Sequence, residues 1–151
     1  MFKIHEAKWL APNVKRFIVH APRVADHHKP GHFVILRVSD DGERIPLTIA
    51  GADPKKGTIS LIWQQVGKTT TELANLNVGD SIANVCGPLG TPTHIENFGM
   101  VVCVGGGIGV APLYPIAKAL KQAGNHITTI IGARSQDLMS LTASRRSRIP
   151  A

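Results

Sequence analysis

Residues 101–113 read VVCVGGGIGVAPL, and this stretch decides how the second part of the chain folds. Its first four residues, Val101–Val104, are mostly β-branched and apolar, which predicts a buried strand. A glycine-rich turn follows, and Ile108–Leu120 then has the apolar pattern of a helix. A strand, a glycine turn and a helix in this order bring free backbone N–H groups and the positive end of a helix dipole together. Such a turn suits a phosphate, because glycines let the backbone approach it closely.

The candidate phosphate-binding residues of this turn are four glycines and a proline: Gly105, Gly106, Gly107, Gly109 and Pro112. Their spacing is G-x-G-x-x-P, whereas a typical dinucleotide-binding turn reads G-x-G-x-x-G. Tight turns between a strand and a helix also occur without any ligand. The other motifs of the sequence are therefore needed to distinguish a nucleotide-binding turn from a purely structural one.

The pattern after the turn predicts one β-α-β unit. The helix extends to about Ala123, Gly124-Asn125 ends it, and Ile127–Gly132 is a second apolar strand. Two strands joined in this way imply a parallel sheet. Two parallel strands cannot cover themselves, and after residue 139 the sequence has no strand or helix period. We therefore expect an incomplete α/β nucleotide-binding domain in a fragment or truncated product.

Residues 1–97 have a different pattern, which predicts six short strands separated by glycine and proline turns. One helix is expected at Thr69–Leu76, with threonines as its N-terminal caps. Alternating short strands of this kind predict a small antiparallel barrel or sandwich, and we expect a six-stranded β-barrel of the Greek-key type. The expected strands are Lys3–Ala7, Val14–His20, Phe33–Val38, Leu47–Ala50, Thr58–Gln64 and Ser81–Val85.

The composition limits the function classes. The chain has 151 residues, 43% of them hydrophobic, and a formal net charge of +7. No apolar run reaches the roughly 20 residues of a membrane helix and no signal peptide is visible, so a cytoplasmic protein without a membrane partner is expected. Cys86 and Cys103 are expected to be reduced, buried thiols, and no metal site is predicted. The modest positive charge suits phosphate-bearing cofactors and does not require nucleic acid.

Three further runs precede the glycine turn in a fixed order: Arg44–Thr48 (RIPLT), Val66–Thr71 (VGKTTT) and Gly87–Gly90 (GPLG). This order resembles the ferredoxin–NADP reductase superfamily. The likeness is greatest to its electron-transfer flavoprotein subunits: the alpha subunit of NADH-dependent ferredoxin–NADP oxidoreductase, the sulfide dehydrogenase subunit and the dihydroorotate dehydrogenase electron-transfer subunit. It covers about residues 1–139. It implies an FAD-binding barrel at 1–97, a partial NAD(P)-binding domain at 98–139 and an irregular basic tail at 140–151.

The resemblance also implies which residues bind FAD. Pro46 and Leu47 would offer an apolar edge to the flavin ring, and the Thr48 hydroxyl would bond a ring nitrogen. The pyrophosphate would lie at a helix N-terminus, with added charge from Arg44; the residues at this terminus are Gly67, Lys68, Thr69 and Thr70. Without the other motifs, RIPLT also fits an edge strand that tolerates a proline.

The sequence departs from the family at several points. The family pattern R-x-Y-S would place its arginine at position 45 and its aromatic residue at 47, where this chain has Ile45 and Leu47. Arg44 is one residue early, which changes its face on a strand. The cysteines that hold a [2Fe–2S] centre in the full-length family are absent.

The function implied is hydride transfer from NAD(P)H to FAD, followed by single-electron transfer to an iron–sulfur or ferredoxin-type partner. No catalytic side chain is needed, because the hydride passes directly to the flavin. A heterodimer with a larger iron–sulfur or flavoprotein subunit is expected. One alternative is a non-catalytic flavin carrier or remnant. Another is a nucleic-acid adaptor that uses the arginines of 145–148.

Overall fold

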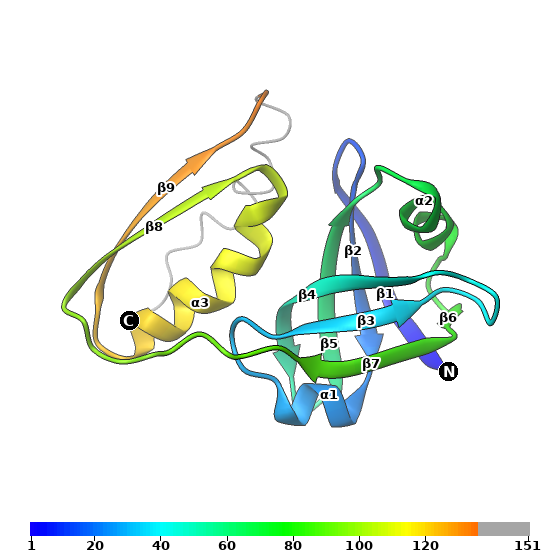
Figure 1. Cartoon of the computed structure of the whole chain (residues 1–151), viewed down its shortest axis with the longest axis horizontal. Helices are drawn as coiled ribbons and strands as arrows, with labels where there is room; N and C mark the ends of the chain where they lie inside the picture. Colours follow the sequence, from blue (N-terminus) through cyan, green and yellow to red (C-terminus); the bar gives the residue numbers. More distant parts are fainter. Residues whose placement is uncertain (136–151) are drawn as a thin grey trace.

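The computed structural model describes residues 1–135, so the expected tail at 140–151 lies outside the described residues. The chain forms a seven-stranded antiparallel sheet followed by a two-stranded parallel sheet with one long helix (Figure 1). We call the first part, β1–β7, the barrel. We call residues 100–132 the α/β unit. This arrangement confirms the predicted succession of an antiparallel β-structure and a β-α-β unit.

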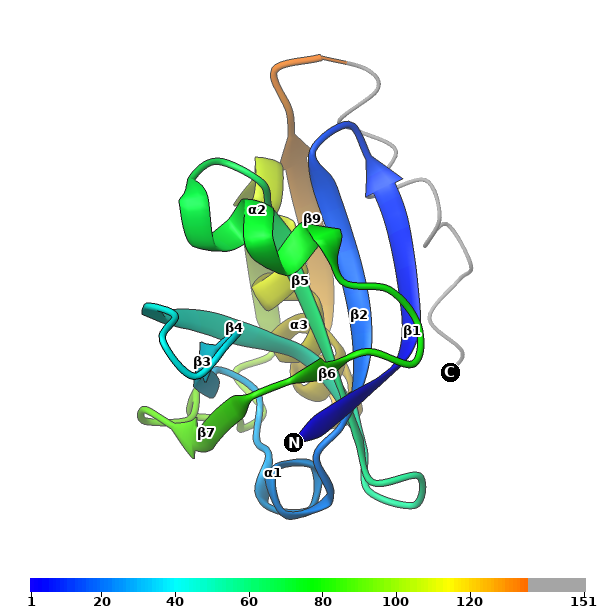
Figure 2. The ribbon, with the colours of Figure 1, turned by 90° about the vertical axis from the view of Figure 1, so that its right-hand side faces the viewer.

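The barrel strands hydrogen-bond in the order β6-β1-β2-β5-β4-β3-β7. Two helices, α1 and α2, lie at opposite ends of the barrel (Figures 1 and 2). The strands and helices, in chain order, are β1 Phe2–Ala11, β2 Val14–His20, α1 Pro22–His27, β3 Phe33–Arg37, β4 Arg44–Asp53, β5 Thr58–Gln64, α2 Lys68–Asn75, β6 Ser81–Ile82 and β7 Asn84–Leu89.

The strand count differs from the six that the sequence predicts, because the expected strand at Ser81–Val85 is divided at Ala83. β6 pairs with β1, whereas β7 pairs with β3, so the chain crosses between two strands at this point. The Ala83 N–H donates to the Val38 carbonyl at 3.3 Å. The sequence prediction also omitted α1, a helix of six residues whose first turn contains Pro22.

The barrel core is aromatic and aliphatic, as the alternation of its strands requires. Phe17 and Trp63 meet edge to face, with ring centroids 4.6 Å apart, and Leu73 of α2 is fully buried beside them. Lys15 is only 4% exposed, and its ammonium donates to the carbonyls of Ala74 and Leu76 at the C-terminal end of α2. A cation at this end of a helix is favourable, so Lys15 fixes α2 to the barrel. Burial lowers the pKa of Lys15.

The α/β unit contains β8 Met100–Gly106, a single 3₁₀ turn η1 Gly107–Gly109, α3 Val110–Gln122 and β9 His126–Gly132. β8 and β9 are parallel and in register. This confirms the predicted β-α-β unit.

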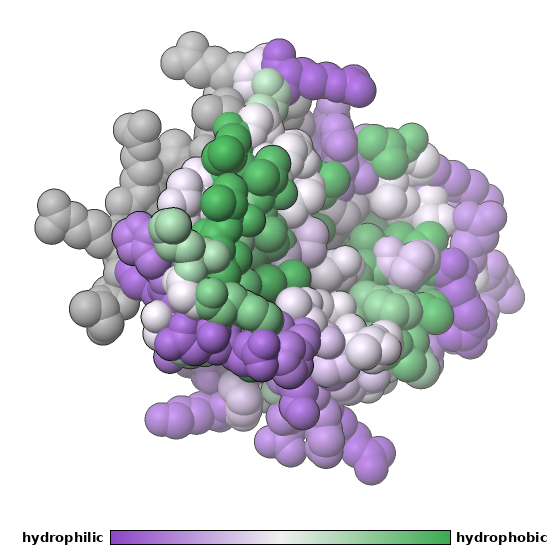
Figure 3. Space-filling view, turned by 60° about the vertical axis from the view of Figure 1, so that its left-hand side comes forward, coloured by the Kyte–Doolittle hydropathy of each residue, from purple (hydrophilic) through white to green (hydrophobic). Residues whose placement is uncertain are grey.

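The prediction of a fully buried strand at 101–104 is wrong, because α3 covers only one face of the two-stranded sheet. On the other face Met100, Val102 and Val104 of β8 and Ile130 of β9 are exposed. Figure 3 shows apolar side chains gathered on this side of the molecule.

A small apolar cluster joins the α/β unit to the outer surface of the barrel. We call this cluster the seam; its members are Val14, Ala50, Ile62, Ile108 and Ala111. The first three belong to strands β2, β4 and β5, and the last two to η1 and α3. The seam therefore positions the glycine turn against the strands of the barrel.

Asn125 attaches the α/β unit to the segment that enters it. Its side chain is buried and makes bonds of 2.6 to 2.8 Å with the Phe98 N–H and with the carbonyls of Glu96 and Leu120. In Asn125→Ala the Phe98 N–H and the Glu96 carbonyl lose this partner, whereas the Leu120 carbonyl keeps a bond of 3.2 Å from the backbone N–H of residue 125. An unpaired group away from water costs about 1–3 kcal/mol. We expect a loss of about 2 kcal/mol in the free energy of unfolding, measured by urea titration. The exposed neighbour Asn97 provides the control: a similar loss in Asn97→Ala would contradict this role for Asn125.

Candidate functional site

The N-terminus of α2 combines a closed turn with free backbone N–H groups in the described part of the chain. Thr70 closes it: its hydroxyl accepts from the N–H groups of Val66 and Gly67 at 3.0 and 2.9 Å and donates to the Gly67 carbonyl at 2.9 Å. The first bond along the helix runs from the Thr71 N–H to the Gly67 carbonyl at 2.9 Å. The N–H groups of Lys68, Thr69 and Thr70 precede this bond, and none has a partner within residues 1–135. These N–H groups at the positive end of a helix suit a phosphate.

Within residues 1–135, neither packing nor backbone geometry requires the glycine at position 67. Its φ of −153° is ordinary extended backbone, and a Cβ at this position would meet no atom within 4 Å. Gly87 is different, because a Cβ there would lie 2.7 Å from Cγ1 of Val34. Gly67 is therefore required neither by packing nor by backbone conformation, and it lies beside free N–H groups. These two features fit a site where a ligand approaches the backbone. The expected FAD pyrophosphate is such a ligand.

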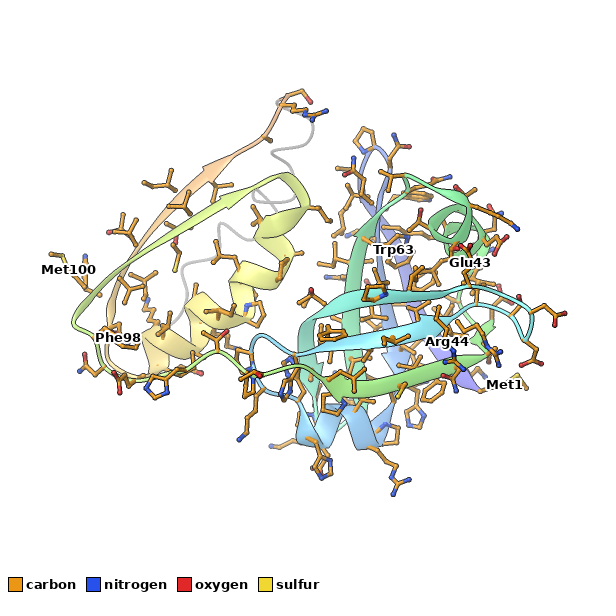
Figure 4. All side chains as sticks on the ribbon, in the orientation of Figure 1. Met1, Glu43, Arg44, Trp63, Phe98 and Met100 are labelled. Atoms are coloured by element: carbon orange, nitrogen blue, oxygen red, sulfur yellow. The ribbon has the colours of Figure 1, made fainter. Side chains whose placement is uncertain are left out.

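The side chains around this turn have different environments. Lys68 is exposed, whereas Thr69 is buried and its hydroxyl donates to Oε2 of Glu43 at 2.8 Å. Glu43 precedes β4, and Figure 4 shows it beside α2. The sequence prediction did not include Glu43, because no spacing pattern connects a residue of the β3–β4 turn with a helix that follows 25 residues later.

The residues of the RIPLT run do not all lie on one face of β4. Pro46 is exposed and Thr48 is half-buried, and strand alternation puts both on the face that also carries Arg44. Leu47 is on the opposite face and packs against the barrel core. The structure therefore brings Pro46 and Thr48 together and separates Leu47 from them. Arg44 donates to Oδ1 of Asn84 at 3.2 Å, toward β7.

The glycines of the second turn have different structural causes. A Cβ at Gly105 would lie 2.9 Å from Cδ2 of Leu113, so this glycine permits α3 to pack closely on β8. Gly107 has a φ of +52°, which favours glycine. Gly109 has helical φ and ψ and an open Cβ position, and at Gly106 the nearest atom would be 3.9 Å away. Pro112 is in the first turn of α3, where its missing N–H costs no helix bond.

The two candidate sites face each other across the seam. Ile108, between Gly107 and Gly109, packs into the cluster that contains Ala50. Ala50 is two residues beyond Thr48 in β4 and therefore shares its face. The glycine turn consequently lies beside the strand that carries Pro46 and Thr48.

The cysteines differ in environment. Cys103 is buried, and burial raises the pKa of its thiol. Cys86 is exposed in β7, so the expectation that both thiols are buried is wrong for this residue. Both thiols are free, and residues 1–135 contain no group of three or more side chains that could hold a metal ion. No helix within these residues is long and apolar enough to span a bilayer.

A seven-stranded antiparallel barrel that carries a helix N-terminus and is joined to a glycine-turn β-α-β unit is the fold of the ferredoxin reductase type. Solved structures agree. One, described as an NADH-dependent reduced ferredoxin–NADP oxidoreductase, superimposes with a TM-score of 0.89 at 49% identity, over 91% of this chain and 50% of that chain. Phthalate dioxygenase reductase shares the fold at 17% identity, with a TM-score of 0.79 over 96% of this chain and 47% of that one.

Curated sequences point to the same relatives. A homolog of the electron transfer subunit of dihydroorotate dehydrogenase B (NAD(+)) from Thermotoga maritima is 52% identical over 130 residues, which is 86% of this chain and 46% of that protein. The subunit from Bacillus caldolyticus is 35% identical over 75% of this chain and 46% of its own length. No family model matches the chain. The chain is thus homologous to proteins named as electron transfer subunits of dihydroorotate dehydrogenase B and to the NADH-dependent ferredoxin–NADP oxidoreductase, as its motifs predict, and it spans about half the length of the curated relatives it matches.

Proposed function

We propose that this chain binds FAD on its barrel and forms part of an NAD(P)H-dependent oxidoreductase subunit that passes electrons to an iron–sulfur or ferredoxin-type partner. The observation that carries this proposal is the N-terminus of α2. There, unpaired N–H groups adjoin Gly67, whose lack of a side chain the fold does not explain. The names of the relatives support the same function, since they include NAD(+), NADH, ferredoxin and electron transfer.

The proposed roles follow from the placement of the residues. The N–H groups of Lys68, Thr69 and Thr70 would hold the pyrophosphate, and the exposed Lys68 would add charge. Pro46 and Thr48 would contact the flavin ring with an apolar surface and a hydroxyl. FAD, when bound, supplies the redox chemistry, because its ring can accept a hydride and release single electrons.

The glycine turn is the proposed site for NAD(P)H. Gly105, Gly106, Gly107 and Gly109 would let its phosphates approach the backbone, and Pro112 would begin the helix. We propose no acid or base among the side chains, because hydride transfer to a flavin needs none. The chain itself would position the flavin ring and the nicotinamide ring of NAD(P)H relative to each other across the seam.

The domain limits belong to this proposal. A boundary at residue 97 is supported by the stretch between β7 and β8, which has no helix or strand. A Greek-key barrel is supported by the strand order: β3, β4 and β5 are consecutive neighbours, and β2 lies beside β5.

An iron–sulfur cluster does not fit this chain. A [2Fe–2S] centre needs four ligands, usually cysteines, and the sequence has only Cys86 and Cys103, which lie on different sheets. We propose that a larger iron–sulfur or flavoprotein subunit forms a heterodimer with the chain.

The test is a titration of the purified 151-residue chain with FAD, followed by anaerobic addition of NADH or NADPH. We expect a yellow protein whose flavin absorbance is bleached by one of the reduced nucleotides. A yellow protein that neither nucleotide bleaches would support the alternative of a non-catalytic flavin carrier. A chain that binds no flavin would contradict the proposal, and binding to nucleic acid would then indicate an adaptor.

A further inference from the structure

A carboxylate is held against the end of α2 at which the proposed function puts the pyrophosphate. Oε2 of Glu43 accepts the hydroxyl proton of Thr69 at 2.8 Å, and Thr69 is only 5% exposed. Because Thr69 is the second residue of α2, this hydrogen bond fixes the carboxylate at the positive end of the helix dipole.

The negative charge of Glu43 is not balanced by an ion pair with any other side chain in residues 1–135. Its neighbour Arg44 donates to Asn84 instead. Figure 4 shows Glu43 near α2 and Arg44 on the side toward β7. The contact that holds Glu43 in the described part of the chain is therefore its bond to Thr69, in the first turn of α2.

We propose that Glu43 is a built-in competitor of the phosphate groups, which occupies the N-terminal end of α2 and lowers the affinity of this end for FAD. The inference rests on the proposed function and adds a residue that sets the strength of the site. Glu43 is exposed and, within residues 1–135, its side chain has no hydrogen-bond or ion-pair partner other than Thr69, so it can turn away when a diphosphate binds. The released Thr69 hydroxyl then becomes a donor for the phosphate.

The test compares Glu43→Gln with the unaltered chain in titrations with FAD and with riboflavin, which has no phosphate. The glutamine keeps an oxygen that accepts from Thr69 but removes the charge. We expect FAD to bind about 3- to 10-fold more tightly, with a smaller gain at high salt, and riboflavin to bind equally well. We also expect a lower melting temperature, because the helix loses a favourable charge. A purely structural role for Glu43 would instead lower both stability and affinity.

Asp41→Asn is the matched control, because Asp41 is exposed in the same turn and makes no hydrogen bond or ion pair with α2 among the described residues. Unchanged or weaker FAD binding in Glu43→Gln would overturn the inference. An equal gain in Asp41→Asn, or an equal gain for riboflavin, would overturn it too. In a Thr69→Val background the gain should shrink, because the anchor of the carboxylate is removed.

If the unaltered chain binds no flavin, the proposed function fails, and inorganic pyrophosphate then becomes the probe. Tighter pyrophosphate binding by Glu43→Gln would support the competitor role by itself. Equal binding of pyrophosphate by both proteins would overturn it.

Discussion

Gly67→Val is expected to reduce FAD affinity by about 100-fold or more while the barrel stays folded. The extended φ of −153° at this position is one that valine adopts readily, and its Cβ would meet no atom of residues 1–135 within 4 Å. The branched side chain would instead stand beside the free N–H groups of α2 and keep a phosphate away from them. Fluorescence titration with FAD measures the loss, and circular dichroism measures the melting temperature.

Lys68→Ala is the companion variant. It removes one exposed charge but leaves the N–H groups accessible, so we expect a loss of about fivefold or less. FAD binding that survives Gly67→Val, or a Lys68→Ala variant that loses more, would show that the backbone turn is not the phosphate site.

The second large effect is expected at Gly109. Gly109→Val should abolish binding of NAD(P)H and leave FAD binding unchanged. The residue has helical φ and ψ, and a Cβ there meets nothing within 4 Å, so the substitution leaves the fold intact. The readout is the reduction of bound flavin by NADH together with an FAD titration of the same sample.

Gly105→Val separates packing from binding at the same turn. Its Cβ would lie 2.9 Å from the Leu113 side chain, so we expect an unfolded α/β unit and loss of nucleotide binding for that reason. If Gly109→Val also lost FAD, or lost its helical signal, the glycine would serve folding and not the nucleotide.

The sequence predicted the elements that have a clear period. The alternation in Val14–His20 and Thr58–Gln64 predicted strands with these bounds, and the glycine turn predicted the strand and helix on either side of it. The helix α1 was missed because six residues are too few to show a helical period. One expected strand is divided at Ala83 because its first part pairs with β1 and its second part with β3. Which strands pair is set by the tertiary structure and is not visible in the local sequence.

The candidate site was only partly visible in the sequence. The RIPLT run indicated a site on a strand, but only the strand geometry shows that Leu47 packs into the core while Pro46 and Thr48 stay outside. Spacing in the sequence also cannot distinguish a glycine that the packing requires from a glycine that leaves room for a ligand. The structure shows that packing explains Gly105, whereas neither packing nor backbone geometry explains Gly67 and Gly109. The contact between Glu43 and Thr69 joins segments that are remote in the chain, so no local pattern could predict it.

Ile108 connects the two halves of the molecule energetically. It stands between two glycines of the nucleotide turn, yet its side chain packs with Ala50 and Ile62 on the barrel. A ligand that holds the turn in place therefore also favours the closed seam, and a closed seam favours the turn that the ligand needs. By thermodynamic linkage such a coupling would be reciprocal, so in the proposed function a ligand at either site would raise the affinity of the other site.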